Sequence, residues 1–233
     1  MFIDYHDFEE NLRKVRGWIE KSAMMAGRSS NAIQLLPVTK NHPLDAARFA
    51  YRSGLKSVGE NRVQEALSKM DDADDEIFWE LIGPLQSNKV KKAAERFYRI
   101  QSVDRIKVVN LLQRHAAEGE RHLRILLQIN TGNDPNKSGA RLEDASALLE
   151  RALNQPNLKV DGLMTIAPLS SDLNIARTSF ASLRKCREDL EESFKVDLPE
   201  LSMGMSGDMQ EAILEGSTIV RVGTALFGKR DNA

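Results

Sequence analysis

A lysine at the end of an apolar run is the first residue whose position suggests chemistry. Lys40 closes the segment from Leu35 to Lys40. If this segment is a β-strand, alternation places Leu36, Val38 and Lys40 on one side and directs the amine over the carboxyl end of the sheet. A lysine desolvated there has its neutral form favoured and can form a Schiff base with a carbonyl compound. The alternative is a strand-end lysine that reaches solvent.

Small and hydroxyl-bearing residues follow two apolar runs near the end of the chain. Ser206 and Gly207 end the stretch 202–207, and Gly223 and Thr224 follow the run 218–222. Small residues let backbone N–H groups approach an anion, and hydroxyls supply further donors. Ser206, Gly223 and Thr224 therefore form a candidate phosphate site, although turns that need glycine would give the same pattern.

An arginine inside the last apolar run is the third candidate. Arg221 shares its strand phase with Ile219 and Gly223, so its guanidinium is expected inside the fold. The guanidinium keeps its proton and only donates hydrogen bonds, so a ligand nitrogen facing it would have to accept one. The alternative is a structural ion pair with Glu60 or Glu80.

Eight short apolar runs supply the elements that must position these residues. They lie near 33–38, 57–59, 78–83, 97–103, 123–130, 158–166, 200–203 and 218–222. Segments of helical periodicity alternate with them, and the stretch from Asp4 to about Met25 predicts an additional leading helix. This pattern predicts a (β/α)8 TIM barrel, an α/β fold whose active face is the carboxyl edge of the strands. A doubly wound open sheet is the alternative.

Individual residues refine this reading of the elements. Pro37 removes a ladder donor from the first strand, so regular pairing is not expected there. Asp104 and Asp172 suit helix N-caps, and Pro43 and Asp45 suit the first turn of a helix.

Composition excludes several classes of function. The 233 residues include 33 Lys and Arg and 34 Asp and Glu, a net charge of −1, so no global field recruits nucleic acid or anionic membrane. The longest stretch without a charged residue, 29–39, is eleven residues and too short for a membrane span. No secretory signal is recognisable at the acidic N-terminus. We expect one cytoplasmic domain over residues 1–233.

No metal site is expected from the distribution of ligand-type residues. The four histidines show no pairing typical of zinc sites, and the acidic block 71–76 lacks the central glycine of a calcium loop. Cys186 is the single cysteine, so an internal disulfide is excluded, and it is expected as an inert thiol on a helix.

Six motifs together resemble a known family, the pyridoxal phosphate homeostasis proteins, which are barrel-only relatives of alanine racemase with the fold-type III barrel. The motifs are Val38-Thr39-Lys40, Gly59 to Glu65, Ile82 to Lys89, Gly162 to Pro168, Leu201 to Ser206, and Arg221 to Thr224. The resemblance extends from about residue 5 to residue 230. Two positions depart from the family, which commonly has His at the place of Glu80 and often Thr at the place of Asn41.

The resemblance implies a cofactor and assigns residues to it. Lys40 would hold pyridoxal 5'-phosphate as a Schiff base, and Arg221 would face the pyridine nitrogen. Ser206, Gly223 and Thr224 would hold the phosphate, and Asn61 would lie beside the ring. The implied partners are the cofactor and the apo-enzymes that receive it, and a monomer is expected.

Carriage of the cofactor without catalytic turnover is the favoured function, and no residue is assigned a catalytic role. The alternatives are a racemase-like enzyme and a Schiff-base aldolase without the cofactor. Racemisation needs a second acid/base, which in alanine racemases is a Tyr from a separate domain, and none of the three tyrosines follows a predicted strand. An arginine at the pyridine nitrogen also weakens the electron sink. An aldolase would not need Arg221.

Overall fold

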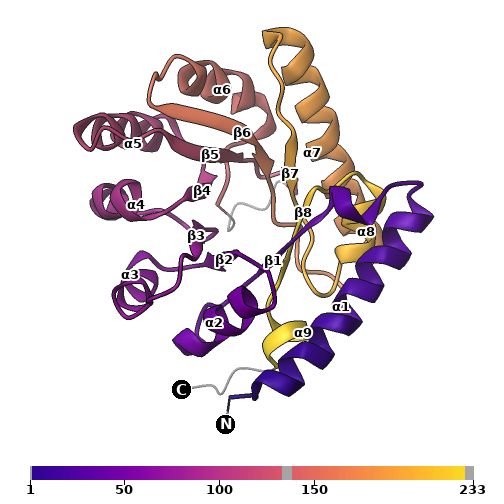
Figure 1. Cartoon of the computed structure of the whole chain (residues 1–233). Helices are drawn as coiled ribbons and strands as arrows, with labels where there is room; N and C mark the ends of the chain where they lie inside the picture. The colour runs from indigo at the N-terminus through magenta and orange to yellow at the C-terminus, as the bar shows by residue number, and fades with distance from the viewer. Residues whose placement is uncertain (1, 133–137, 229–233) are drawn as a thin grey trace.

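The barrel predicted from the sequence is the architecture of residues 2–132 and 138–228, which this computed structural model describes (Figure 1). Eight parallel strands lie in the order β1-β8-β7-β6-β5-β4-β3-β2. They are β1 (Gln34–Pro37), β2 (Ser57–Glu60), β3 (Phe78–Leu81), β4 (Arg99–Val103), β5 (Leu123–Gln128), β6 (Leu158–Met164), β7 (Glu200–Ser202) and β8 (Ile219–Val222). Each of the eight apolar runs contains one strand, and the alternative of an open doubly wound sheet is wrong.

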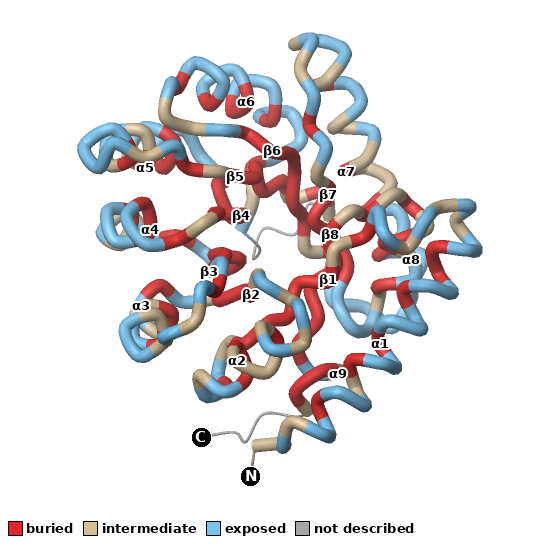
Figure 2. The backbone as a smooth tube through the Cα atoms, viewed as in Figure 1, coloured by how far each residue is buried: buried red, intermediate tan, exposed pale blue. Residues whose placement is uncertain are grey.

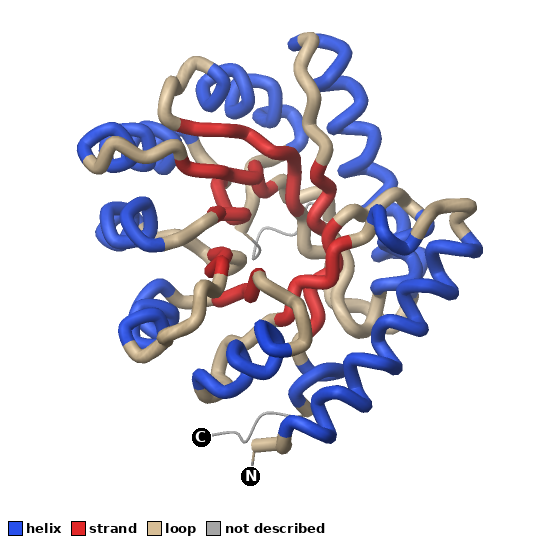
Figure 3. Tube along the Cα trace, viewed as in Figure 1, coloured by secondary structure: helices blue, strands red, loops and turns tan. Residues whose placement is uncertain are grey.

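Helices surround the strands on the outside of the barrel (Figure 3). They are α1 (Tyr5–Met25), α2 (Leu44–Arg52), α3 (Val63–Asp71), α4 (Val90–Arg96), α5 (Ile106–Glu118), α6 (Ala145–Leu153), α7 (Leu173–Phe194), α8 (Met209–Leu214) and α9 (Thr224–Phe227), with 3-10 turns η1 (Ser30–Ala32), η2 (Ser87–Lys89) and η3 (Leu142–Asp144). The leading helix is confirmed as α1. It begins after Asp4, whose carboxylate accepts from the amide of Asp7 at 2.9 Å. Asn11 Nδ2 donates to the Leu226 carbonyl at 3.1 Å and so joins α1 to α9.

Two predicted helix caps have different outcomes. Asp172 caps α7, because its side chain accepts from the amide of Asn174 at 2.9 Å. Asp104 is not a cap, and that prediction is wrong. The chain stays extended through Arg105, which is the residue before α5, and the Asp104 carboxylate pairs with the Arg105 guanidinium instead.

The seam between β1 and β2 carries the proline. The amide of Val38 donates to Val222 of β8 at 2.8 Å, and the amide of Thr39 donates to Gly59 at 3.0 Å. Successive backbone nitrogens of a strand point to opposite sides, so the nitrogen of Pro37, like that of Thr39, faces β2. Proline has no amide proton, and this nitrogen therefore donates no hydrogen bond to β2. In the described residues β1 meets β2 at the bridge between Val38 and Gly59. Pro37 nevertheless belongs to β1 and pairs with Val222 of β8, so among the described residues the expected loss of regular pairing is confined to the side that faces β2.

The core has two layers. The larger cluster fills the space between strands and helices, and Figure 2 shows the buried residues along the strands and the inward faces of the helices. The smaller cluster lies inside the barrel and consists of Leu36, Val38, Ile82, Leu126, Met164 and Ile219. This inner layer forms the floor below the carboxyl ends of the strands. Within the ranges described, no helix has both the length and the apolar composition needed to cross a bilayer.

Candidate functional site

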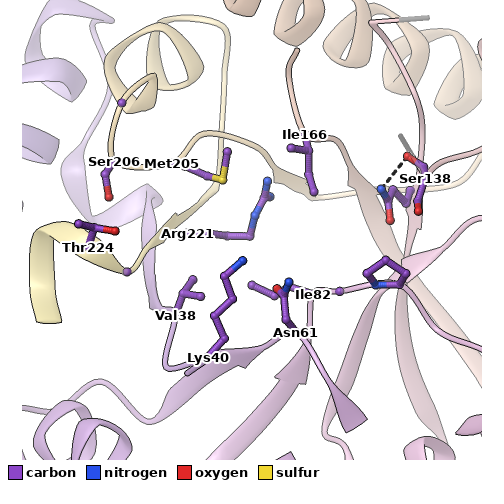
Figure 4. A pocket seen from close by; sticks show the side chains of 15 residues that line it. Val38, Lys40, Asn61, Ile82, Ser138, Ile166, Met205, Ser206, Arg221 and Thr224 are labelled. Atoms are coloured by element: carbon purple, nitrogen blue, oxygen red, sulfur yellow. Dashed lines mark hydrogen bonds between the residues drawn. The ribbon is translucent and has the colours of Figure 1, made fainter. Parts of the chain in front are cut away.

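A cavity of about 450 Å³ opens at the carboxyl ends of the strands, and Figure 4 shows it from close by. This volume lies within the usual range of small-molecule sites, about 300–1,000 Å³. All six residues singled out from the sequence line it: Lys40, Asn61, Ser206, Arg221, Gly223 and Thr224. They lie in the segments that follow β1, β2 and β7, in β8 and at the start of α9, so the barrel joins residues that are far apart in the sequence.

Lys40 lies in the turn that follows β1. The amide of His42 donates to the Thr39 carbonyl at 3.1 Å, which closes the turn around Lys40 and Asn41. Asn41 has φ 59°, a left-handed conformation that asparagine tolerates better than most residues. Figure 4 shows the Lys40 side chain extending into the cavity beside Val38 and toward Arg221. The amine therefore lies at the mouth of the barrel as expected, but on a turn beyond β1 and not at the end of the strand itself.

Ser206 and Thr224 lie on one side of the cavity, opposite Asn61 (Figure 4). The loop that carries Ser206 is shaped by Asp208, whose carboxylate accepts from the amide of Met205 at 2.6 Å. Burial raises the pKa of Asp208, and the Met205 amide and the charge of Arg221 oppose that rise.

The segment that carries Thr224 starts a short helix. The amides of Leu226 and Phe227 both donate to the Gly223 carbonyl at 2.9 Å. The amides of Thr224 and Ala225 precede this first closed turn, and the first amides of a helix have no carbonyl partner within it. Two hydroxyls and these amides can therefore donate hydrogen bonds to an anion at this side of the cavity.

Arg221 is held inside the barrel by neutral acceptors. Its Nη1 donates to Ser202 Oγ at 2.7 Å and its Nη2 to the Thr165 carbonyl at 2.8 Å. Burial lowers the pKa of Arg221 to about 10, which leaves it protonated at pH 7. The alternative of an ion pair with Glu60 or Glu80 is wrong, because each of these carboxylates pairs with another cation.

A buried hydrogen-bond chain continues from Arg221 through the barrel interior. Ser202 Oγ donates to Gln101 Oε1 at 2.6 Å, and Gln101 Nε2 donates to Glu80 Oε2 at 2.7 Å. Glu80 in turn accepts from Arg99 Nε at 2.8 Å. Glu80, one of the two departures from the family pattern, is therefore part of the network that orients Arg221. These partners lie on β3, β4 and β7, and no local sequence signal connects them.

Asn61 directly follows β2 and meets a glycine of the next strand end. A Cβ built on Gly83 would overlap the carbonyl group of Asn61. Only glycine permits this approach, so Gly83 allows the ends of β2 and β3 to come together at the cavity wall.

Other lining residues were given no role in the sequence analysis, although all of them except Gln128 and Ser138 lie in the family motifs or in the stretch 202–207 named there. They are Val38, Ile82, Gly83, Pro84, Gln128, Ser138, Ile166, Met205 and Gly207. Gln128 ends β5 and donates to the Ser138 carbonyl at 2.9 Å, the dashed bond in Figure 4. A polar residue at the end of an apolar run is the same signal that identified Lys40, so this signal could also have identified Gln128.

The described residues add neither a metal-ligand cluster nor a reactive thiol to this cavity. Residues 2–132 and 138–228 contain no group of three or more His, Cys, Asp or Glu side chains that could hold a metal ion. Cys186 lies on α7, as predicted, and burial raises the pKa of its thiol to about 11. The ionisable side chains on the described cavity wall are those of Lys40 and Arg221.

Comparison with known proteins agrees with this geometry. The model of the family "alanine racemase, N-terminal domain" matches residues 3–231. A pyridoxal phosphate homeostasis protein of Pseudomonas aeruginosa is 43% identical, with 95% of each chain covered. The structure of PipY from Synechococcus elongatus with pyridoxal phosphate bound is 38% identical, with a TM-score of 0.81 over 91% of this chain and 100% of that one.

A more distant structure shows the fold alone. An alanine racemase of Clostridium difficile has a TM-score of 0.79 at 11% identity, over 95% of this chain and 56% of the racemase. The resemblance found in the sequence motifs is confirmed by the closer relatives. The chain belongs to the alanine racemase N-terminal domain family and, within it, to the pyridoxal phosphate homeostasis proteins.

Proposed function

We propose that this protein binds pyridoxal 5'-phosphate in the barrel-mouth cavity and serves in intracellular homeostasis and carriage of that cofactor, without catalytic turnover. The observation that carries the proposal is that the Lys40 amine, the Arg221 guanidinium and the pair of hydroxyls on Ser206 and Thr224 line a single cavity. The cofactor has an aldehyde, a pyridine nitrogen and a phosphate, one group for each of these. A relative, PipY, has been solved with pyridoxal phosphate bound, which supports the proposal that this chain binds the same cofactor.

Each of the six lining residues singled out from the sequence has a role in this proposal. Lys40 binds the aldehyde as a Schiff base, and Arg221 donates to the pyridine nitrogen, which must then stay unprotonated to accept. Ser206, Gly223 and Thr224 bind the phosphate. Asn61 lies beside the ring. When bound, the cofactor supplies an electrophilic carbonyl and an electron sink.

The absence of turnover is supported by the chemistry of the wall. Racemisation needs two acid/base groups on opposite faces of the substrate carbon. On the described part of the wall the ionisable side chains are Lys40 and Arg221, and a permanently charged donor such as Arg221 is a poor proton acceptor. Tyr5 and Tyr51 lie on α1 and α2, and Tyr98 precedes β4, outside the cavity lining.

Reductive trapping tests the attachment. Borohydride added to the cofactor-loaded protein is expected to fix the cofactor on Lys40, located by peptide mass mapping, since this amine extends into the cavity. The Lys40→Ala variant is expected to lose the adduct and keep weaker noncovalent binding through Arg221 and the phosphate site. An adduct mainly on another lysine, such as Lys89, would overturn the assignment.

Three further parts of the proposal concern the cell and the assembly. The protein passes its cofactor to apo-enzymes, it is cytoplasmic, and it is a monomer. Transfer is measured by mixing the loaded protein with an apo-enzyme and following the activity that the apo-enzyme regains. Size-exclusion chromatography with light scattering measures the oligomeric state.

A further inference from the structure

The turn that carries Lys40 is held from outside the barrel by three charged residues, Glu60, Glu65 and Lys69, here called the clamp. Lys69 Nζ donates to Glu60 Oε1 at 2.7 Å and to Glu65 Oε1 at 2.9 Å. The same ammonium donates to the backbone carbonyl of Thr39 at 2.8 Å. All three donor positions of this ammonium are therefore used within the protein.

The clamp holds both neighbours of Lys40. On one side, the Thr39 hydroxyl donates to Glu60 Oε1 at 2.6 Å. On the other side, the backbone amide of Asn41 donates to Glu65 Oε1 at 2.5 Å. Lys40 therefore lies between two residues that are each fixed to a carboxylate, and both carboxylates are fixed to Lys69.

The clamp lies outside the cavity lining. None of Glu60, Glu65 and Lys69 is among the residues of the cavity wall, whereas Lys40 is. Glu60 is fully buried and Lys69 is 8% exposed, so these charges interact where water screens them little. Burial raises the pKa of Glu60, and Lys69 and the Thr39 hydroxyl oppose that rise. The clamp makes its hydrogen bonds to the neighbours of Lys40, Thr39 and Asn41, so it acts on the position of Lys40 through the backbone of the turn.

The turn itself needs external support. Asn41 adopts φ 59°, which costs free energy for a residue with a side chain. The β1–β2 seam beside it is bridged at Val38 and Gly59 and lacks the donor of Pro37. Neither local backbone preference nor strand pairing fixes the turn strongly, and the bonds to Glu60, Glu65 and Lys69 supply that restraint.

We infer that Lys69, acting with Glu60 and Glu65, is a positioning residue that holds the Lys40 amine where it can react with a carbonyl. This inference rests on the proposed role of Lys40. In the reaction, the neutral amine adds to the carbonyl carbon. The carbonyl oxygen then leaves as water with the two amine protons, so that a C=N bond replaces C=O. Such a reaction depends steeply on placement of the nucleophile, whereas noncovalent binding at the opposite wall does not.

The test compares two ligands in the Lys69→Met variant, which keeps most of the side-chain stem and removes the ammonium. Pyridoxal 5'-phosphate carries the aldehyde, and pyridoxine 5'-phosphate carries an alcohol in its place. We expect the Kd of the aldehyde ligand to rise about tenfold to a hundredfold and the borohydride adduct on Lys40 to fall. The Kd of the alcohol ligand is expected to change by less than about twofold, because Lys69 is independent of its contacts.

A second variant and a matched control complete the experiment. Glu65 is partly exposed, so the variant Glu65→Ala should fold even if Lys69→Met does not. It removes the hydrogen bond to the Asn41 amide and therefore tests the clamp independently. Glu215→Gln alters another carboxylate held by two cations, Arg177 and Arg184, away from the cavity. The control is expected to change the stability but not the ratio of the two Kd values.

The outcomes separate the clamp from the proposed function. An unchanged ratio in the clamp variants, with both ligands weakened equally or neither affected, would show that the clamp serves stability alone. If the unaltered protein forms no adduct on Lys40, the proposed function fails first and the inference fails with it.

Discussion

The phosphate side of the cavity allows the most quantitative prediction. In the double variant Ser206→Ala, Thr224→Ala, both hydroxyls are removed from residues that are exposed at the cavity wall. A hydrogen bond to a charged group contributes about 1.5–3 kcal/mol, so two of them contribute roughly 3–6 kcal/mol. The Kd of pyridoxal 5'-phosphate should therefore rise by about two to four orders of magnitude.

The comparison with pyridoxal makes the assay specific. This ligand has the same ring and aldehyde but no phosphate, so its Kd should stay nearly unchanged in the double variant. Both ligands are titrated by absorbance and by dialysis, with Ser182→Ala on α7 as a control that removes a partly exposed hydroxyl outside the cavity lining. An equal loss of affinity for both ligands would refute the reasoning, since Ser206 and Thr224 would then act through the fold.

Three other measurements follow from the site and its surroundings. Racemase, transaminase and decarboxylase assays with common amino acids should give no turnover above that of free cofactor, and sustained stereochemical exchange of alanine would contradict this. Gly83→Ala should lower the free energy of unfolding, measured in urea, by about 1–3 kcal/mol, because the added Cβ overlaps the Asn61 carbonyl. The control Gly17→Ala has open space around the added Cβ and should not lower it. Equal urea midpoints for the two variants would count against the overlap. The rate of Cys186 alkylation by iodoacetamide should rise about tenfold per pH unit up to about pH 9.5. Burial raises the pKa of this thiol to about 11, so the thiolate fraction keeps growing over that range. A rate that stops rising near pH 8.5 would show an ordinary thiol.

The sequence was sufficient for the barrel and for the residues at its mouth. Each strand is a short apolar run, and a parallel barrel brings all carboxyl ends to one face, so a strand-end rule finds Lys40 without knowledge of any contact. The same rule and the strand phase place Arg221 inside β8. Asn61, Ser206, Gly223 and Thr224 line the cavity with them, and their roles toward the cofactor stay predictions.

The partners of these residues could not be read from the sequence. Ser202, which accepts from Arg221, bonds to Gln101, and the two are 101 positions apart. Periodicity indicates which side of a strand a residue faces, but not which of several inward polar groups it meets. The start of α5 was misplaced for a similar reason. The Asp104 carboxylate could accept from an amide of the first helical turn or pair with the neighbouring Arg105 guanidinium, and the structure shows the pair. The i, i+4 spacing of Glu65 and Lys69 was a visible signal for part of the clamp.

The interrupted pairing at Pro37 bears on local opening of the barrel. In the described residues β1 and β2 meet at one bridge, so few ladder hydrogen bonds hold this junction of the ring closed. Lys40 follows one side of this junction and Asn61 the other. In the proposed function one ligand contacts both residues and so favours the closed ring, which would link occupancy thermodynamically to ring closure. Amide hydrogen exchange in β1 and β2 would then report how much of the protein carries its ligand.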